Sequence, residues 1–383
     1  METVSPFKEV IEEIRETGGE AIKYCYQCGK CDTTCPWNRV RQFSVRKLIR
    51  EASLGLSEIE KDHIWLCTTC GKCPQRCPRD VRQIEDIVAV RRIATRYNVF
   101  SDTAKPIKTI NSNLNQTGIP FGDERDKRYS WSSGLNIPKF KVGMDYLYFP
   151  CCYLAYDPRL KKTAMATAKI LNHFKISFGV IGEKENCCGE SIRKTGNEEL
   201  FRNLSKSNIK NYIDNDVTDI LVSSPHCYYT FKNEYNQFRV NFNVLHMVEL
   251  LFQLLEKGEL QFNKDFPKKV VYHDPCYLGR HLGIYDEPRE ILKSINGIEL
   301  LVMEEEREDA LCCGMGGGRV WMETEKDERF SNIRLGQAID TGAEVLVTAC
   351  PYCITNFEDT RIVLNAEDRI EIMDITELIS QLI

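Results

Sequence analysis

The run Cys25-Tyr26-Gln27-Cys28-Gly29-Lys30-Cys31-Asp32-Thr33-Thr34-Cys35-Pro36 spaces four cysteines by three, three and four residues and ends on proline. The same spacing recurs in a second run, which comprises Cys67, Cys70, Cys73, Cys77 and Pro78. The first three thiolates of such a run hold one cubane cluster, while the fourth ligates the other cluster when two are present. We therefore expect two [4Fe-4S] clusters with exchanged fourth ligands. The two ligand sets are Cys25, Cys28, Cys31 and Cys77, and Cys67, Cys70, Cys73 and Cys35.

Zinc is the alternative metal for these thiolates. Zinc sites use paired C-x-x-C halves rather than runs of four cysteines, so the spacing favours iron–sulfur clusters. The first hundred residues are expected to be mostly helical. One helix should begin at Ser5-Pro6 and end at Gly18-Gly19, a second should cover 45–52, and a third should contain Ile84. A helix between the two runs resembles the ferredoxin modules of succinate dehydrogenase and heterodisulfide reductase, which implies an electron wire.

The 18 cysteines of this 383-residue chain are grouped rather than scattered, and no export signal is apparent at its start. We therefore expect metal-binding thiolates in a cytoplasmic protein. Apolar stretches such as 244–255 are shorter than the roughly 20 residues that span a bilayer, so any membrane association would require a partner subunit.

The charge is unevenly distributed. Residues 1–100 hold 17 Lys and Arg against 14 Asp and Glu, whereas the whole chain has a net charge of −5. A mildly basic surrounding suits anionic clusters, although solvated helix faces explain the same charges equally well. Nothing in this pattern indicates a nucleic-acid partner.

Short apolar runs alternate with helical patterns after residue 141, which predicts an α/β architecture. The expected strands are 146–149, 178–181, 220–223, 270–273, 300–303 and 345–348. Residues 101–141 are rich in Asn, Ser, Gly and Pro and indicate a connector. The predicted fold class is α+β and multidomain. Its expected parts are a helical ferredoxin-type domain at 1–100, a linker at 101–145, and two pseudo-symmetric α/β domains at 146–262 and 263–383.

The prediction of two such domains comes from an internal repeat. Cysteines of the first part recur 124 to 126 residues later in the same order. The pairs are Cys152 and Cys276, Cys187 and Cys312, Cys188 and Cys313, and Cys227 and Cys353. A constant offset at four positions indicates two homologous units.

The second copy has five cysteines, and they indicate more than one metal ion. They are Cys276, Cys312, Cys313, Cys350 and Cys353. Adjacent cysteines form no unstrained disulfide, and five thiolates exceed what one tetrahedral metal needs. Cys350 and Cys353 should open a helix, whose free N–H groups stabilise thiolates. Gly314, Gly316 and Gly317 would let backbone amides approach a cluster. A phosphate loop is a weak alternative, because no Lys-Ser/Thr follows these glycines.

The sequence around these cysteines resembles the CCG domain of the heterodisulfide reductase catalytic subunit. The resemblance rests on Cys276, Cys312-Cys313-Gly314 and Cys350-x-x-Cys353, within the segment His273-Asp274-Pro275-Cys276-Tyr277-Leu278-Gly279-Arg280. With the ferredoxin module it extends over almost the whole chain, and it includes the related iron–sulfur subunit of sulfite-reductase-associated membrane complexes. The resemblance implies that the five cysteines hold a noncubane [4Fe-4S] cluster at which a disulfide is cleaved.

The first copy departs from this pattern. Ser224 stands where the second copy has Cys350, and an extra Cys151 precedes Cys152, where the family usually has glycine. A serine hydroxyl resists deprotonation and is a poor iron ligand. Cys151 is the candidate substitute, and a buried structural cysteine is the alternative. The expected ligands are Cys151, Cys152, Cys187, Cys188 and Cys227, and whether they hold a second, modified cluster stays open.

Weaker signals surround both motifs. His226, His273 and His281 are candidate proton donors or structural residues. Arg280 and Arg319 are candidates to hold an anionic substrate, and surface ion pairs are the alternative.

Three functions remain in competition. The first is reduction of a disulfide by a subunit that receives electrons through its cubanes, in complex with a cytochrome b-like or flavoprotein partner. The second is an electron relay. Similar proteins relay electrons for glycolate, lactate and glycerol-3-phosphate dehydrogenases, or link electron-transferring flavoprotein to quinone. The third is a metal-free dithiol at Cys350 and Cys353.

Overall fold

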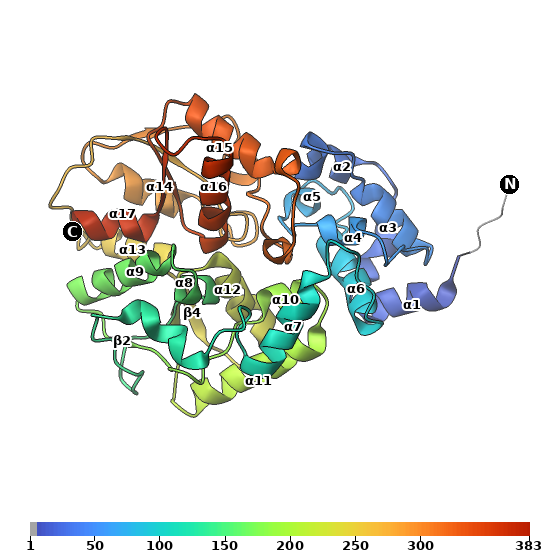
Figure 1. The fold of residues 1–383 in the computed structure, drawn as a ribbon, viewed down its shortest axis with the longest axis horizontal. Coiled ribbons are helices and arrows are strands. Elements are labelled where there is room, and N and C mark those ends of the chain that lie inside the picture. Colours follow the sequence, from blue (N-terminus) through green and yellow to red (C-terminus); the bar gives the residue numbers. More distant parts are fainter. Residues whose placement is uncertain (1–5) are drawn as a thin grey trace. The chain divides into compact units, whose positions relative to one another are not determined.

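The computed structural model describes residues 6–383, and its internal contacts separate two compact units. Unit 1 contains the chain up to residue 112 together with 191–201 and 314–330. Unit 2 contains 113–190, 202–313 and 331–383. Figure 1 traces the chain from blue to red. Ser5, where the first helix was expected to begin, lies outside the described residues.

Unit 1 is built from short helices around the two cysteine runs. Its helix α3, Val45–Ser53, confirms the second predicted helix and buries Val45, Leu48, Ile49 and Ala52 on one face. Ser44 caps that helix, because its hydroxyl accepts the Lys47 amide at 3.0 Å. The third predicted helix is α6, Gln83–Arg96. The other elements here are α1 (Lys8–Glu16), η1 (Glu20–Tyr24), α2 (Lys30–Thr34), η2 (Pro36–Arg39), α4 (His63–Leu66) and α5 (Lys72–Gln75).

Two segments of unit 1, 191–201 and 314–330, come from later in the chain. They follow the adjacent cysteines Cys187-Cys188 and Cys312-Cys313 of the two repeats. Buried Arg91 ties them to the second cysteine run by donating to the carbonyls of Cys67, Lys194 and Gly317, at 2.8, 3.0 and 2.9 Å. A β-carbon on Gly317, whose φ is +63°, would lie 2.4 Å from the Cys67 carbonyl oxygen. Only glycine permits this approach without a backbone shift.

Unit 2 contains two four-stranded parallel sheets with the same strand order. The first has the order β2-β1-β3-β4 and the second β6-β5-β7-β8. The bounds are β1 (Tyr146–Phe149), β2 (Phe178–Gly179), β3 (Asp219–Val222), β4 (Asn243–His246), β5 (Lys269–Tyr272), β6 (Glu299–Leu301), β7 (Val345–Thr348) and β8 (Glu371–Asp374). The shared order confirms the predicted pair of pseudo-symmetric α/β domains. Strands β4 and β8 were not anticipated.

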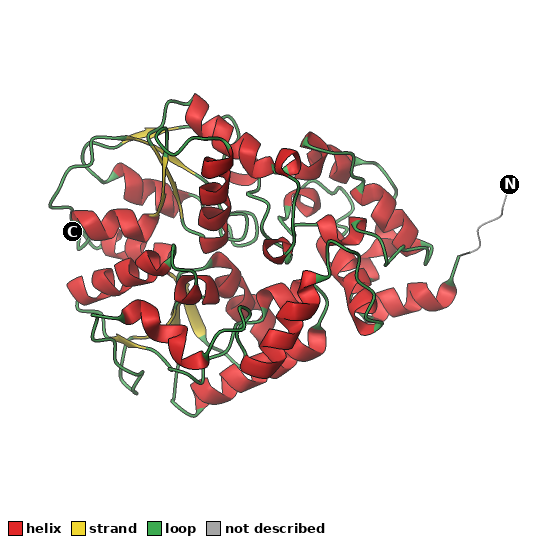
Figure 2. Cartoon of the chain, viewed as in Figure 1, coloured by secondary structure: helices red, strands yellow, loops and turns green. Residues whose placement is uncertain are grey.

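Helices flank both sheets, as Figure 2 shows in red around the yellow strands. The helices of the first domain are α8 (Cys152–Tyr156), α9 (Lys161–His173), α11 (Glu198–Ile213), α12 (Pro225–Tyr229) and α13 (Met247–Glu256), while most of α10 (Glu190–Lys194) and the start of α11 fall in the unit 1 segment 191–201. Those of the second are α14 (Asp286–Lys293), α15 (Phe330–Asp340), α16 (Pro351–Val363) and α17 (Ile375–Leu382). Shorter turns are η4 (Thr230–Glu234), η5 (Tyr235–Phe238), η6 (Arg307–Asp309), η7 (Arg319–Trp321) and η8 (Lys326–Glu328).

The two α/β domains pack on each other inside unit 2. Helix α17 lies against α9, and α13 lies against α14. The Thr163 hydroxyl donates to the Glu377 carboxylate across this contact, and both side chains are buried. The segment predicted as a connector contains α7 (Pro106–Thr117) and η3 (Arg125–Ser132). Its periodic Ile107, Ile110 and Leu114 are buried.

Among residues 6–383, no helix has the length and apolar composition that a membrane crossing requires.

Candidate iron–sulfur centres

The structure brings Cys77 to the first cysteine run. A cavity of about 20 Å³ is lined by Cys25, Cys28, Cys31 and Cys77, although Cys77 belongs to the second run in the sequence. The amide of Val81 points at the Cys77 sulfur at 3.4 Å, and the Gln27 side chain at the Cys25 sulfur at 3.3 Å. These N–H groups favour negative charge on sulfur. The four thiols therefore have the composition and surroundings that a [4Fe-4S] cluster needs.

Cys35 has the reciprocal position beside the second run. Burial raises the pKa of the Cys35 thiol, and the nearby Cys70 and Cys67 raise it further. Burial likewise raises the pKa of Cys73, with contributions from Cys67, Cys70 and Cys35. Buried thiols that crowd together resist ionisation unless a cation joins them. A cluster iron supplies that cation, so the set fits an iron–sulfur group.

The five cysteines of the second cysteine-rich domain converge at the carboxyl ends of its sheet. Cys276 follows β5, Cys350 follows β7 and caps α16, and Cys353 lies in the first turn of that helix. The sulfur of Cys353 lies 3.3 Å from that of Cys313, and Cys353 also contacts Cys350. Cys276 contacts Cys312. All five are at most 7% exposed, so bulk water is excluded from the site.

A histidine from the first domain reaches this second site. The His226 side chain forms a hydrogen bond with the Cys350 thiol, and its Nδ1 lies 3.1 Å from Glu190 Oε1. Burial lowers the pKa of His226, but Glu190 and Cys350 outweigh burial and raise it to about 10. Burial raises the pKa of Cys350, but its bonds to Cys353 and His226 prevail and lower it to about 5. The arrangement favours an imidazolium beside a thiolate.

Aromatic rings hold the His226 imidazole in place. Its ring centroid lies 4.0 Å from that of Tyr277 and 4.4 Å from that of Tyr352, with interplanar angles of 32° and 36°. Both tyrosines belong to the second domain. The ring therefore cannot turn away from Cys350 without disturbing two buried side chains.

His273 is the second histidine at this site. One of its nitrogens lies with the sulfurs of Cys313 and Cys353, all three within 4.8 Å of one another. Burial lowers the pKa of His273, and the Arg334 guanidinium lowers it further. Arg334 donates to Nδ1 of His273 at 3.2 Å. A neutral imidazole results, and because Nδ1 accepts from Arg334 its proton lies on Nε2, which is able to donate a hydrogen bond.

The first cysteine-rich site gathers its cysteines in the same way. The sulfurs of Cys188 and Cys227 are 3.5 Å apart, and Cys152 contacts Cys187. Buried Arg128 directs Nη1 at the Cys152 sulfur at 3.4 Å. Burial lowers the pKa of Arg128, but Glu185 and Cys152 raise it well above its usual value. A permanent cation thus lies beside this cluster of thiols.

The remaining predicted residues have more local contacts. Gly316 and Gly317 pack on the backbone of Thr68 and Cys67 in unit 1, and their role at a cluster stays a prediction, as does that of Gly314. Arg280 donates to the carbonyls of Glu308 and Ala310. His281 stacks on Tyr277, with centroids 4.4 Å apart.

Arg319 is buried, not part of a surface ion pair. Its Nη2 donates to the Glu323 carbonyl at 2.7 Å and to the Thr324 hydroxyl at 2.5 Å. Its guanidinium lies over the Trp37 ring, 5.6 Å from the centroid. These contacts all lie inside unit 1. They explain Arg319 as a residue that fixes the segment 314–330.

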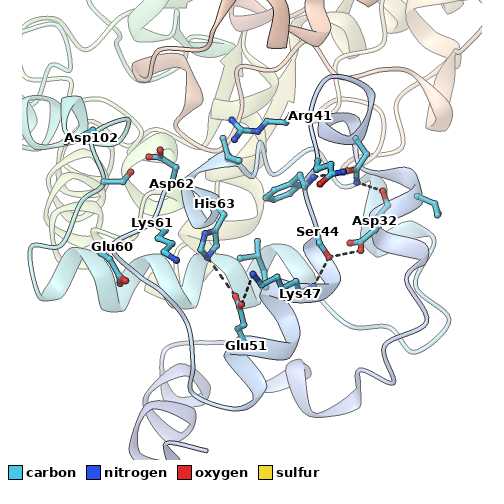
Figure 3. Close-up of a pocket in the computed structure, with 17 residues that line it drawn as sticks. Asp32, Arg41, Ser44, Lys47, Glu51, Glu60, Lys61, Asp62, His63 and Asp102 are labelled. Atoms are coloured by element: carbon cyan, nitrogen blue, oxygen red, sulfur yellow. Dashed lines mark hydrogen bonds and ion pairs between the residues drawn. The ribbon is translucent and has the colours of Figure 1, made fainter. Parts of the chain in front are cut away.

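Unit 1 also has an open recess of about 940 Å³, shown in Figure 3. Charged residues of both signs line it, including Asp32, Lys47, Glu51 and His63. The Ser44 hydroxyl donates to Asp32 at 2.7 Å. Asp32 and Leu66, which also lines the recess, are the sequence neighbours of Cys31 and Cys67. The recess therefore adjoins both cysteine runs.

Several residues at these sites were not found by sequence reasoning. Glu190 directly follows the Cys187-Cys188-Gly189 motif, but a single carboxylate beside a motif is common by chance. Arg128 and Glu185 lie outside any motif. The repeat offset contained one signal for His226. It aligns His226 in the first copy with Tyr352 in the second. A histidine where the other copy has an aromatic core residue suggests a contact that the other copy lacks.

Family models match three segments of the chain. A 4Fe-4S dicluster domain matches residues 21–81, and a cysteine-rich domain called CCG matches residues 146–232 and again residues 270–358. A crystal structure of a hypothetical protein from Helicobacter pylori is similar in fold, with a TM-score of 0.53 and 12% identity, over 98% of this chain and 72% of that one. The fold and the site thus define an iron–sulfur protein with a dicluster domain and two cysteine-rich domains.

The relatives are iron–sulfur oxidoreductases. The probable iron-sulfur-binding oxidoreductase FadF of Bacillus subtilis is 37% identical over 78% of this chain and 43% of its own length. The EtfAB:quinone oxidoreductase of Syntrophomonas wolfei is 33% identical over 86% of this chain and 48% of its own length. One subunit of the dihydromethanophenazine:CoB–CoM heterodisulfide reductase of Methanosarcina acetivorans is 31% identical over 73% of both chains. The chain belongs to the family of this heterodisulfide reductase subunit, and it spans about half the length of the first two relatives.

Proposed function

We propose that this chain is an electron-transfer subunit that reduces a disulfide at its second cysteine-rich site. Electrons reach the site singly through two cubane clusters, held by Cys25, Cys28, Cys31 and Cys77 and by Cys67, Cys70, Cys73 and Cys35. A noncubane [4Fe-4S] cluster is held by Cys276, Cys312, Cys313, Cys350 and Cys353. When bound, that cluster offers iron to a substrate sulfur and passes on single electrons.

The contact between His226 and Cys350 is the observation that carries this proposal. Reduction of a disulfide breaks one S–S bond, consumes two electrons and two protons, and yields two thiols. A site for this reaction needs a hydrogen-bond donor where negative charge develops on sulfur. His226 provides one, and the Glu190 carboxylate 3.1 Å away keeps it oriented. The proposed cubanes also have N–H groups directed at cysteine sulfurs, from Val81 and Gln27, but those donors are uncharged. The charged donor is what sets His226 apart.

The test is reduction of disulfides by the anaerobically loaded protein, with reduced benzyl viologen as the electron source. The expected result is two dye molecules oxidised and two thiols formed for each disulfide. Cys313→Ala should abolish thiol formation and leave intact the stoichiometric reduction of the two cubanes by the dye, one electron for each cluster. Should no disulfide in a panel of alkyl, aryl and anionic substrates yield thiols, the reductase proposal is wrong.

An electron relay to quinone is the second candidate. The relatives FadF and EtfAB:quinone oxidoreductase favour it, as does the burial of all five second-site cysteines, since a relay needs no access for substrate. Reoxidation of a reduced electron-transferring flavoprotein by the loaded chain, without thiol formation, would establish this function instead. Under either function the recess beside Asp32 is where we expect a partner to deliver electrons, and a partner subunit would provide any contact with a membrane.

A further inference from the structure

The first cysteine-rich site lacks one cysteine of the repeat. Ser224, in the place of Cys350, is buried at the start of α12, and its hydroxyl has no hydrogen-bond partner among residues 6–383. An alkoxide is hard to form near neutral pH, so Ser224 is a poor match for the thiolate it replaces. A fifth sulfur must come from elsewhere if the site is to equal the second.

The contacts between sulfurs show where that fifth sulfur lies. Each of the three thiol contacts described for the second site has a counterpart at the first. The contact Cys276–Cys312 corresponds to Cys152–Cys187, and Cys313–Cys353 corresponds to Cys188–Cys227. The third contact, Cys350–Cys353, corresponds to Cys151–Cys227. Cys151 therefore touches Cys227 as Cys350 touches Cys353. The thiol of Cys151 thus makes the contact that the missing cysteine would make, although it comes from a different part of the motif.

The backbone at Cys151 supports a role for its side chain. Cys151 lies between β1 and α8 with φ +63° and ψ 147°, a conformation that suits glycine and is strained for any residue with a β-carbon. Strain of this kind persists where the surrounding structure or a function requires the side chain. Glycine would avoid this strain, so the presence of a side chain here favours a function for the Cys151 thiol.

The charge of the site also suits an anionic group. Arg128 is fully buried, directs Nη1 at the Cys152 sulfur, and is held by Glu185 through Nε at 2.9 Å. The Glu185 carboxylate and the Arg128 guanidinium have opposite charges and together form a dipole. The positive end of this dipole, the guanidinium, faces the Cys152 sulfur. Cluster thiolates are stabilised by such an arrangement.

We propose that Cys151 is the fifth thiolate ligand of the first cysteine-rich site, which therefore holds an iron–sulfur cluster of its own with Cys152, Cys187, Cys188 and Cys227. The donor set is five sulfurs, the same number as at the second site, and the three contacts described for the second site each have a counterpart here. This inference concerns metal binding and is independent of which substrate the second site reduces.

Iron and acid-labile sulfide content, with Mössbauer spectra, test the proposal on the full-length chain. The unaltered protein should hold about 16 irons, four for each of four clusters. Cys151→Gly should lower the count to about 12 without harming the fold, since glycine suits the backbone there. Cys151→Ser keeps the β-carbon and removes the thiolate, and it should give the same loss.

Two further variants separate Cys151 from Ser224. Ser224→Ala should keep about 16 irons, because the hydroxyl is not a ligand. The double variant with Cys151→Gly and Ser224→Cys should regain the lost irons by restoring the ligand arrangement of the second site. An unchanged iron count and spectrum in Cys151→Gly, or a loss of iron in Ser224→Ala, would overturn the assignment. A count of about 12 in the unaltered protein that falls to about 8 in Cys151→Gly would support it and show that the second site is the empty one.

Discussion

The imidazole of His226 forms a hydrogen bond with the thiol of Cys350, and the two residues belong to different cysteine-rich domains. His226 stands in the first copy where the second copy has Tyr352, and Glu190 stands where it has Met315. At these two positions the first copy therefore has an ion pair that reaches its neighbour, where the second copy has an aromatic and an apolar residue. Duplication has left two sites with similar sulfur arrangements and different polar surroundings.

Replacing His226 tests this relationship. His226→Gln should slow disulfide reduction roughly 10- to 100-fold, the range seen when a residue that supports metal ligands is lost. It should also shift the reduction potential of the second-site cluster, because a charged donor to Cys350 disappears. Turnover and a potentiometric titration followed by EPR provide the measurements.

His281→Gln is the matched control, since His281 stacks on the same Tyr277. It should leave the reduction potential unchanged. Equal shifts in the two variants would mean that ring packing, rather than the bond to Cys350, sets the potential.

The two cysteine-rich sites should differ in their importance for turnover. Cys313→Ala should abolish disulfide reduction and leave both cubanes intact, because it removes one of the five proposed thiolate ligands of the second site, the one in contact with Cys353. Cys188→Ala should reduce activity less, since Arg128 at the first site is a permanent cation that does not release a proton. Thiol formation and cubane EPR signals check both statements. Equal loss of turnover in two folded variants would show that both sites act on substrate together.

The sequence was informative about the fold where side-chain patterns are periodic. The apolar runs at Tyr146–Phe149 and Val345–Thr348 are strands with those bounds. Strands β4 and β8 escaped prediction because each is short and leads directly into an apolar helix, so no turn residues mark the change. Their starts, Asn243 and Glu371, are 128 residues apart, close to the cysteine offset of 124 to 126, so the repeat relates these two strands as well.

The candidate sites were predictable only in part, because spacing reveals ligands and not their surroundings. Equal spacing identified the cysteines, whereas the Arg128 contact with Cys152 joins residues from a connector and a helix that share no pattern. The glycines after Cys313 were expected near a cluster on account of their small size. The structure shows a separate reason for Gly317, which is the close approach of the Cys67 carbonyl.

The close packing of Gly317 on the Cys67 carbonyl predicts that a larger side chain at this position lowers the stability of the protein. Gly317→Ala should destabilise the protein by about 1–3 kcal/mol more than Gly342→Ala, because an added β-carbon overlaps backbone atoms. Gly342 also has a positive φ, +79°, but a β-carbon added there would meet nothing within 4 Å. The comparison therefore removes the contribution of backbone conformation. Thermal unfolding measures the difference, and the signal of the cluster ligated by Cys67 should change in Gly317→Ala alone.

Asp86 should make the stability of unit 1 depend on pH. Burial, with a contribution from Glu85, raises the pKa of Asp86 from 3.8 to about 7. The folded chain therefore binds this proton more tightly than the unfolded chain, and stability falls as pH rises from about 4 to 7. Asp86→Asn should stabilise the protein at pH 8 by at most about 4 kcal/mol and have little effect at pH 4. Glu9→Gln, at an exposed position of the same unit that does not act on Asp86, is the control for thermal unfolding, and a pH-independent gain in Asp86→Asn would contradict the assignment.

The exchange of fourth ligands between the two cysteine runs makes the sharpest prediction about electron transfer. Cys77 lines one cavity with Cys25, Cys28 and Cys31, whereas Cys35 lies beside Cys67 and Cys70. Cys77→Ala should therefore damage the cluster of the first run, although the altered residue belongs to the second.

The matched variant Cys35→Ala should damage the cluster of the second run. Loss of one of four thiolates typically leaves a three-iron cluster or none, so EPR of the oxidised and reduced protein distinguishes the two variants. Each variant should retain one intact cubane, and electron delivery to the second cysteine-rich site should fail in both, because the clusters act in series. If Cys77→Ala instead spares the cluster of Cys25, Cys28 and Cys31 and destroys that of Cys67, Cys70 and Cys73, each run holds its own cluster and the exchange is wrong.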